Sequence, residues 1–283
     1  MATEQTHAPR SSRPAASDGS RAIAAAPGIF ASRFLVPLLA IIVALVLWWA
    51  VVAAFKIPDY LLPAPQVVVA RIVKEWRALL SHGAYTLLSV LTGFASAVAI
   101  GVPIAFAIVL SRSIERITMP FLVMSQTIPK VAIAPILVVW LGFGILPKIA
   151  IVFLISFFPI VVNVATGLAS MEPELEDVLR ALGAKKLDIM LKVGIPRTQP
   201  YLFGSLKVAI TLAFVGAVMS ETIGANSGLG HLMVQAGSNF QMPLVFACLL
   251  GLAVEGIVMY AVFAYVEAYF TGWAFRSSMS AAA

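Results

Sequence analysis

The sequence contains little charge and a single cysteine. Asp, Glu, Lys and Arg together make up 11% of its 283 residues, whereas an average soluble domain has about 25%. Hydrophobic residues reach 61%, and they form long unbroken runs rather than the short alternating segments of a membrane barrel. The lone Cys248 excludes a disulfide scaffold and is expected in a buried helix. The class that remains is an all-α integral membrane protein.

Patterns typical of enzymes and nucleotide-binding proteins are also missing. His7, His82 and His231 lie far apart without metal-ligand spacing, and no paired carboxylates or Ser/His/Asp arrangement stands out. There is no G-x-x-x-x-G-K-[ST] phosphate loop. No cofactor or metal is therefore expected in this chain, and an ATP-driven process would need a separate subunit to hydrolyse the nucleotide. Nucleic acid is not expected as a partner, because the basic residues fall between apolar runs instead of forming a stripe.

Six apolar runs are long enough to cross a bilayer. They cover about residues 34–55, 85–110, 118–143, 149–169, 201–223 and 243–270. Residues 1–33 are expected to form a disordered tail, 56–83 an external segment with a short surface helix, and 271–283 a C-terminal tail. Pro129 and Pro135 interrupt the third run, which predicts either a segment that lines a cavity or simple kinks in a packed bundle.

Basic residues gather on one side of these runs. The tail, the polar turn at 111–117 and the region 171–207 hold most of the Lys and Arg, so the positive-inside rule places both termini in the cytoplasm. The external segment 56–83 is an exception, because it carries Lys56, Arg71, Lys74 and Arg77.

Small residues recur at every fourth position of the second run. They share one helix face, and small residues allow membrane helices to approach closely. A tight helix–helix seam is predicted, although chance spacing is the alternative. The seam residues are Ser89, Gly93, Ala97, Gly101 and Ala105.

Ionisable residues within the runs are candidates for a translocation path. Lys130 and Glu255 lie near the middle of their runs, and Glu221 lies at the outer end of the fifth. A charge at mid-bilayer costs at least about 2.5–3.5 kcal/mol. We expect Lys130 to face the path with Glu255 or Glu221 as its counter-ion; a purely structural ion pair is the alternative.

The stretch 171–197 is by far the most charged part of the chain. Acidic residues come first and Lys185 and Lys186 follow, an order that suits a helix macrodipole. Gly183 interrupts the stretch, and Pro196 with Pro200 is expected to end it. Two short helices with a glycine hinge are predicted, projecting from the membrane as a docking surface.

This stretch resembles the EAA loop of ABC importer permeases. Residues 177–184, Asp-Val-Leu-Arg-Ala-Leu-Gly-Ala, are followed by Ile195 and Pro196; Asp177 stands in place of the family's Glu and Leu179 in place of an Ala. The stretches 61–65, 129–135, 140–144, 157–159 with Asn163, and 220–230 are similar to nitrate/sulfonate/taurine-type permeases.

The resemblance implies a type I ABC importer permease with six transmembrane helices, in which residues 84–270 form the permease domain. A cytoplasmic ABC ATPase, carrying ATP and Mg, would grip the EAA loop 171–197, and an extracytoplasmic substrate-binding protein would deliver the solute. A second permease copy would complete a dimer in the lipid bilayer of a bacterial inner membrane. The implied coupling residues are Asp177, Leu179, Ala181, Gly183, Ala184, Ile195 and Pro196, and the candidate path residues are Lys130, Glu221, Glu255 and Asn163.

The solute expected from this resemblance is a small anion such as a sulfonate, taurine or nitrate. A thiamine pyrimidine precursor is the alternative on the same machinery. A stand-alone secondary transporter or channel would leave the charged loop unexplained, and an intramembrane enzyme would lack its reactive residues.

Overall fold

The computed structural model describes residues 28–170 and 172–280. Most of the predicted N-terminal tail, residues 1–27, lies outside them. Contacts divide the chain after Leu47 into two units. The described part of the first unit belongs to α1 (Gly28–Phe55), which begins before the predicted start at residue 34. The large apolar side chains from Leu35 to Leu47 are exposed, as expected for a helix surrounded by lipid.

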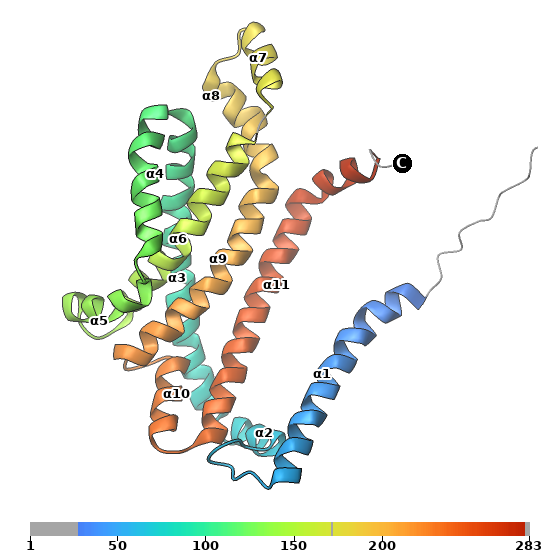
Figure 1. Ribbon diagram of the computed structural model, residues 1–283, viewed down its shortest axis with the longest axis vertical. Coiled ribbons are helices and arrows are strands. Elements are labelled where there is room, and N and C mark those ends of the chain that lie inside the picture. Colours follow the sequence, from blue (N-terminus) through green and yellow to red (C-terminus); the bar gives the residue numbers. More distant parts are fainter. Residues whose placement is uncertain (1–27, 171, 281–283) are drawn as a thin grey trace, which may run out of the picture. The chain divides into compact units, whose positions relative to one another are not determined.

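The second unit, from Trp48 onward, is helical throughout its described residues apart from short connections (Figure 1). α3, α6 and α9 pack against one another, and α11 packs against α9. After α1 the helices are α2 (Pro65–Lys74), α3 (Trp76–Leu110), α4 (Arg112–Thr127), α5 (Lys130–Leu141), α6 (Ile145–Ala169), α7 (Pro173–Ala181), α8 (Lys186–Ile189), the π-helical turn Met190–Gly194, α9 (Ile195–Gly224), α10 (Leu229–Ser238) and α11 (Met242–Ser280).

Within residues 28–170 and 172–280, five helices are long and apolar enough to cross a membrane, and the pair α4 and α5 gives a sixth span if it is taken as one. The two members of that pair meet at 104°. The break falls at Ile128, which is extended, and Pro129. Proline has no N–H to donate and pushes the preceding residue out of helical geometry. The third predicted span is therefore a bent pair.

Further predicted boundaries differ from the structure: α3 begins at Trp76, inside the segment 56–83 that was expected to be external. The polar turn expected at 111–117 is reduced to Ser111, because α4 begins at Arg112; the Ser111 hydroxyl accepts a hydrogen bond from the Ile114 N–H at 3.5 Å. At the other end, α11 continues as a helix to Ser280, past the predicted start of a tail at residue 271.

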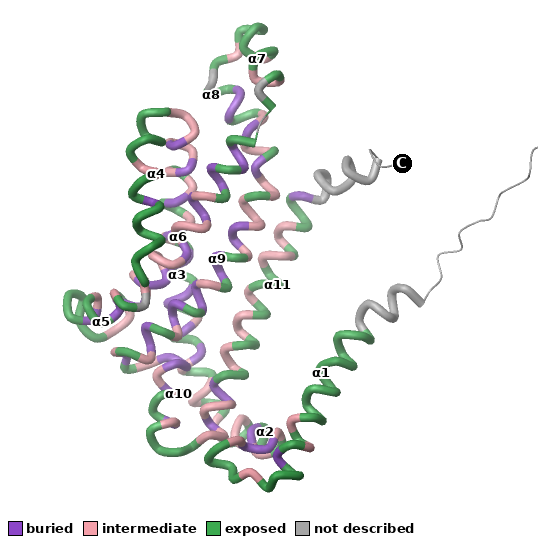
Figure 2. Tube along the Cα trace, in the orientation of Figure 1, coloured by how far each residue is buried: buried purple, intermediate pink, exposed green. Residues whose placement is uncertain are grey.

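The core of the second unit lies between α3, α6 and α9, where buried residues face one another (Figure 2). The stripe of small residues, Ser89, Gly93, Ala97, Gly101 and Ala105, is buried on α3. A Cβ atom on Gly93 would lie 2.6 Å from the Cβ of Val152 on α6. The absence of a side chain at Gly93 therefore sets how closely α3 approaches α6.

Candidate functional site

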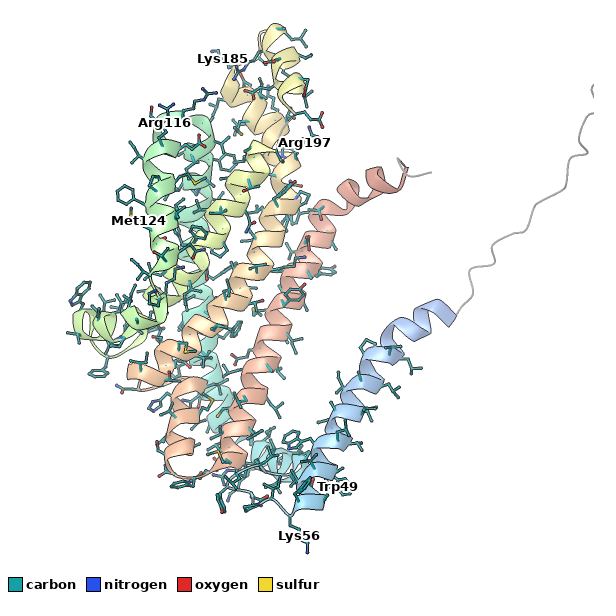
Figure 3. All side chains as sticks on the ribbon, viewed as in Figure 1. Trp49, Lys56, Arg116, Met124, Lys185 and Arg197 are labelled. Atoms are coloured by element: carbon teal, nitrogen blue, oxygen red, sulfur yellow. The ribbon has the colours of Figure 1, made fainter. Side chains whose placement is uncertain are left out.

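The charged stretch after α6 forms a helical hairpin at one end of the second unit (Figure 3). α7 and α8 are joined by a turn in which Gly183 adopts a φ of +84°. The Gly183 N–H donates to the Arg180 carbonyl at 2.9 Å and the Ala184 N–H to the Leu179 carbonyl at 3.0 Å. This is the Schellman arrangement, which caps a helix with a residue in the left-handed region, usually glycine. The Gly-Ala pair is thus explained by local backbone chemistry.

Apolar side chains of the hairpin remain uncovered within the described chain. Val178, Leu182 and Leu187 have exposed fractions of 58%, 79% and 56%. Asp177 and Ala181 are exposed on the same hairpin. Exposed apolar residues gathered on a charged projection are typical of a surface that binds another protein. We call α7, α8 and the turn between them the coupling hairpin.

One ion pair lies at the base of the hairpin and another lies within α7. Arg197 Nη2 donates to Glu172 Oε1 at 2.9 Å, and Arg180 pairs with Glu176 within α7. A cavity of about 590 Å³ separates α7 from the adjoining ends of α3, α4 and α6. Its lining includes Ser111, Arg112, Glu176, Arg180 and Met190. Because a cavity underlies it, α7 is not packed tightly against the bundle.

The predicted end of this stretch at Pro196 and Pro200 is wrong. α8, the π-helical turn and α9 follow without a break, and the apolar span runs from Leu187 to Gly224. Pro196 lies directly after the π-helical turn, where the residues before it keep helical angles, and Pro200 lies inside α9. Ile195 and Pro196 are half-buried. The coupling hairpin is therefore continuous with a membrane helix, which can carry its movement into the bilayer.

A second group of polar residues is buried at the opposite end of the bundle. Lys148 of α6 and Glu221 of α9 are exposed by only 2% and 1%, and Lys148 Nζ lies 3.4 Å from Glu221 Oε1. The Thr86 hydroxyl of α3 donates to Glu221 at 3.0 Å. Lys148 also donates to the carbonyl of Ser227, which precedes α10. This polar cluster connects four elements.

Two glycines allow the chain before α10 to close over Glu221. Gly228 has a φ of +108°, and a Cβ there would lie 2.0 Å from Glu221 Oε1. The Gly230 N–H donates to Glu221 Oε2 at 2.9 Å, and the Leu229 N–H donates to the Thr86 hydroxyl at 2.9 Å. The start of α10 thus satisfies buried acceptors that would otherwise be costly. The glycines of the Ser-Gly-Leu-Gly stretch are required by this contact.

Histidines border the polar cluster. The Gly228 N–H donates to His82 Nδ1 at 3.1 Å, and the His82 and His231 rings stack with centroids 6.3 Å apart. Burial, followed by the nearby His82 and Lys148, lowers the pKa of His231 below its usual value. No group of three or more His, Cys, Asp or Glu suited to a metal ion is present among the described residues.

The expected counter-ion of Lys130 is wrong. Glu221 pairs with Lys148, while Lys130 Nζ donates to Gln126 Oε1 at 2.7 Å and lies 5.9 Å from the Phe158 ring centroid. Lys130 lines a groove of about 500 Å³ that includes Phe121, Phe157 and Phe158. The sequence does not mark Lys148 as a buried charge, because Lys148 stands directly before its apolar run and resembles a loop residue. The available signal was one basic residue, Lys148, directly before an apolar run that follows the glycines at 142 and 144.

The two other candidate path residues do not line the groove that holds Lys130. Asn163 is exposed and donates to the Pro159 carbonyl one turn earlier, at 2.8 Å. Glu255 is half-buried beside Gly83, where a Cβ would lie 2.4 Å from Glu255 Oε1. Glu255 also lines a separate groove of about 400 Å³ with Leu229 and Gly251. A role for Lys130, Asn163, Glu221 and Glu255 in a translocation path stays a prediction.

A helical membrane bundle with an exposed apolar hairpin at one end and a buried polar closure at the other has the features of a transport permease. The chain belongs to the family described as the binding-protein-dependent transport system inner membrane component, which matches residues 97–271. It is accordingly a multi-pass transport permease and not an enzyme.

Relatives of known name agree with this assignment. The chain is 35% identical to a probable ABC transporter permease protein of Haemophilus influenzae, over 81% of this chain and 93% of that protein. It is 34% identical to the formylaminopyrimidine transport permease protein ThiX of Halalkalibacterium halodurans, over 80% and 90%. It is 27% identical to the taurine transport system permease protein TauC of Escherichia coli, over 77% and 81%.

A solved structure shares the fold. The MetNI methionine ABC transporter in an inward-facing conformation matches with a TM-score of 0.58 and 20% identity, over 69% of this chain and 95% of that one. The type I importer fold expected from the sequence is thereby confirmed.

Proposed function

We propose that this chain is the transmembrane subunit of an ATP-driven ABC importer and that its coupling hairpin seats a separate cytoplasmic ATPase, which holds the ATP and Mg. The single observation that carries the proposal is the exposed apolar set Val178, Leu182 and Leu187 on a hairpin continuous with α9. Movement of a docked ATPase would be transmitted along α9 to the polar cluster at its far end. The family description, which names a binding-protein-dependent system, supports the same assignment.

The assembly we propose contains two copies of this permease in a bacterial inner membrane, with both termini in the cytoplasm. An extracytoplasmic binding protein delivers the solute at the end that carries α2 and α10. Support comes from the distribution of Lys and Arg along the chain. Arg116, Lys185 and Arg197 lie at one end of the second unit, and Lys56 lies at the other (Figure 3). Positive residues favour the cytoplasmic side.

The proposed solute is a small organic or inorganic anion such as a sulfonate, taurine or nitrate. Lys130 supports an anion, because its ammonium group borders an open groove. Similarity to TauC points the same way. A pyrimidine precursor of thiamine is the second candidate, supported by the similarity to ThiX and by the phenylalanine rings of that groove, which could stack on a planar ring.

Reconstitution in proteoliposomes tests the proposed coupling. Uptake is expected only with the ATPase, ATP and the binding protein present; uptake by this chain alone would indicate a secondary transporter. The binding protein's own ligand, measured by calorimetry, would separate an anion from a pyrimidine. Sulfonate, taurine, nitrate and formylaminopyrimidine are the probes.

Gly183→Val tests the hairpin itself. A β-branched residue at φ +84° is strained by about 1–2 kcal/mol, so the turn should deform, and solute-stimulated ATPase activity should fall about tenfold or more. Gly183→Asn is the matched control, because asparagine tolerates the left-handed region and should keep most of the activity. Membrane insertion should be unchanged in both. Equal activity in the two variants would contradict a conformational role for Gly183.

A further inference from the structure

α2 is an amphipathic helix that lies against the start of the last membrane helix. Its Val68 is 1% exposed and belongs to an apolar cluster with Leu232, Leu244 and Cys248. On its other sides Val69 and Val73 are exposed by 57% and 69%. Exposed apolar side chains on a short helix beside a membrane span are expected at the bilayer interface.

The residue that follows this helix supports the same placement. Trp76, at the start of α3, is half-exposed, and the Arg77 guanidinium lies 5.4 Å from its ring centroid. Tryptophan is enriched at the level of the lipid headgroups. We therefore expect α2 and the start of α3 at the level of the lipid phosphate groups.

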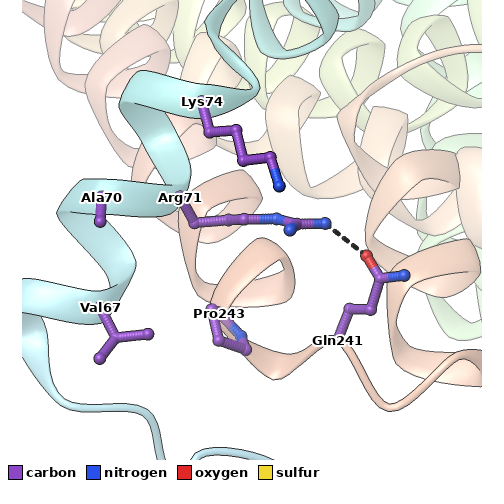
Figure 4. A pocket seen from close by; sticks show the side chains of 6 residues that line it. All are labelled: Val67, Ala70, Arg71, Lys74, Gln241 and Pro243. Carbon is purple, nitrogen blue, oxygen red and sulfur yellow. Dashed lines mark hydrogen bonds between the residues drawn. The ribbon is translucent and has the colours of Figure 1, made fainter.

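A pocket of about 320 Å³ opens between α2 and the turn before α11 (Figure 4). Arg71 Nη2 donates to Gln241 Oε1 at 2.6 Å, and Lys74 extends in the same direction as Arg71. The remaining lining is apolar: Val67, Ala70 and Pro243. Two cations and an amide thus converge beside an apolar wall.

The charges of this pocket are only partly balanced. Glu75 lies 3.6 Å from Arg71, so Lys74 leaves the group with a net positive charge. Arg71 Nε is buried without a hydrogen-bond partner among the described residues. These basic residues belong to the segment whose charge departs from the positive-inside pattern. An anionic partner in contact with the pocket would account for them.

We propose that this pocket binds a phospholipid, with Arg71 and Lys74 holding the phosphate and the apolar wall accepting the glycerol and upper acyl chain. Guanidinium and ammonium groups complement a phosphate diester, and the exposed Val69 and Val73 beside them suit hydrocarbon. An acidic patch of a soluble binding protein would match the cations but not these apolar side chains. A lipid held here would fix α2 against α11. The proposal does not depend on the transport function.

Native mass spectrometry of the purified protein in detergent tests the proposal, because a micelle has no anionic surface to attract charges in general. Lys74→Gln should weaken retention of added palmitoyl-oleoyl phosphatidylglycerol about fivefold, the effect of one basic residue near an anionic surface. Arg71→Gln combined with Lys74→Gln should weaken it further. The matched control, Lys56→Gln with Arg77→Gln, removes two charges from the same segment outside the pocket and should leave retention within about twofold.

Three results would overturn the assignment. Equal loss in the pocket and control variants would show general charge attraction. Displacement of the lipid by millimolar inorganic phosphate would show a site for a free anion. Weakened docking of the substrate-binding protein by Lys74→Gln, with lipid retention unchanged, would show a protein interface. Lys74→Gln keeps the test valid if the Arg71 variant fails to fold, because Lys74 makes no hydrogen bond or ion pair with the described residues.

Discussion

Buried charges carry the largest single-residue effects in this protein. Lys148 and Glu221 are almost fully buried and form an ion pair, so removing one partner leaves the other charge without compensation. Lys148→Met should lower the free energy of unfolding by about 3–5 kcal/mol, measured by denaturant titration in detergent. Adding Glu221→Gln should restore part of the loss.

Lys207→Met provides the comparison for this prediction. Lys207 pairs with Glu267 at 2.5 Å, but both side chains are less buried than Lys148 and Glu221, so an unpaired Glu267 loses less hydration and the loss of stability should be smaller than for Lys148→Met. A Lys148 variant no less stable than the Lys207 variant would show that the polar cluster is hydrated.

His231 should make stability depend on pH. Its pKa is lowered in the folded protein, chiefly by burial, so the unfolded chain binds the proton more readily. The contribution of His231 is therefore complete above its usual pKa of about 6.5 and is lost as the pH falls below that value. Melting temperatures between pH 7.5 and pH 5.5 should decrease, and less so in His231→Gln. An unchanged pH dependence in that variant would assign the effect to other groups.

Residue identity alone indicated which charges matter but not which of them meet. Lys130 and Glu221 stand out in the sequence because charges inside apolar runs are costly. Lys148 does not stand out, since the partner of Glu221 is set by the packing of α6 against α9 and by the chain that returns before α10. Pairings between distant segments depend on tertiary contacts that one sequence does not reveal.

At the scale of whole helices, the contact of α3 with α6 leaves no room for a side chain at Gly93. Gly93→Ala would place a Cβ 2.6 Å from Val152 and 2.8 Å from the Ile149 carbonyl, so the helices must separate, at an expected cost of about 1–3 kcal/mol. Gly204→Ala is the matched control, because a Cβ there meets nothing within 4 Å. It should be neutral or slightly stabilising, since alanine favours helix. Equal melting temperatures for the two variants would contradict close packing at Gly93.

The membrane helices were predicted better than the connections and boundaries between them. Apolar run length identified the membrane helices, because each must satisfy its own backbone groups in lipid. Proline was the ambiguous signal: Pro129 breaks a span, whereas Pro196 and Pro200 are accommodated in α9. The difference lies in the backbone before each proline: Ile128 is extended, whereas Ile195 keeps helical angles directly after the π-helical turn. The Gly183 turn was predictable because it is a local capping motif.

For the molecule as a whole, the opposed ends of the second unit imply a defined orientation in the membrane. A coupling hairpin can meet a cytoplasmic ATPase only if it faces the cytoplasm. The connection between α1 and α2, which contains Asp59, must then face outward. The single native cysteine, Cys248, is fully buried, so an impermeant maleimide should leave the wild-type chain unlabelled. Lys185→Cys should react only in inverted membrane vesicles, and Asp59→Cys only in spheroplasts.

Both variants place a thiol at an exposed position, so failure to react cannot be assigned to burial in the protein. Labelling of Lys185→Cys from outside would reverse the orientation and remove the proposed contact with an ATPase, while leaving the fold intact. Labelling of both variants from both sides would show that the vesicles leak, which a cytoplasmic marker enzyme reveals. Because both positions belong to the second unit, opposite labelling establishes that this unit spans the bilayer and that its hairpin lies on the ATP side, as the coupling mechanism requires.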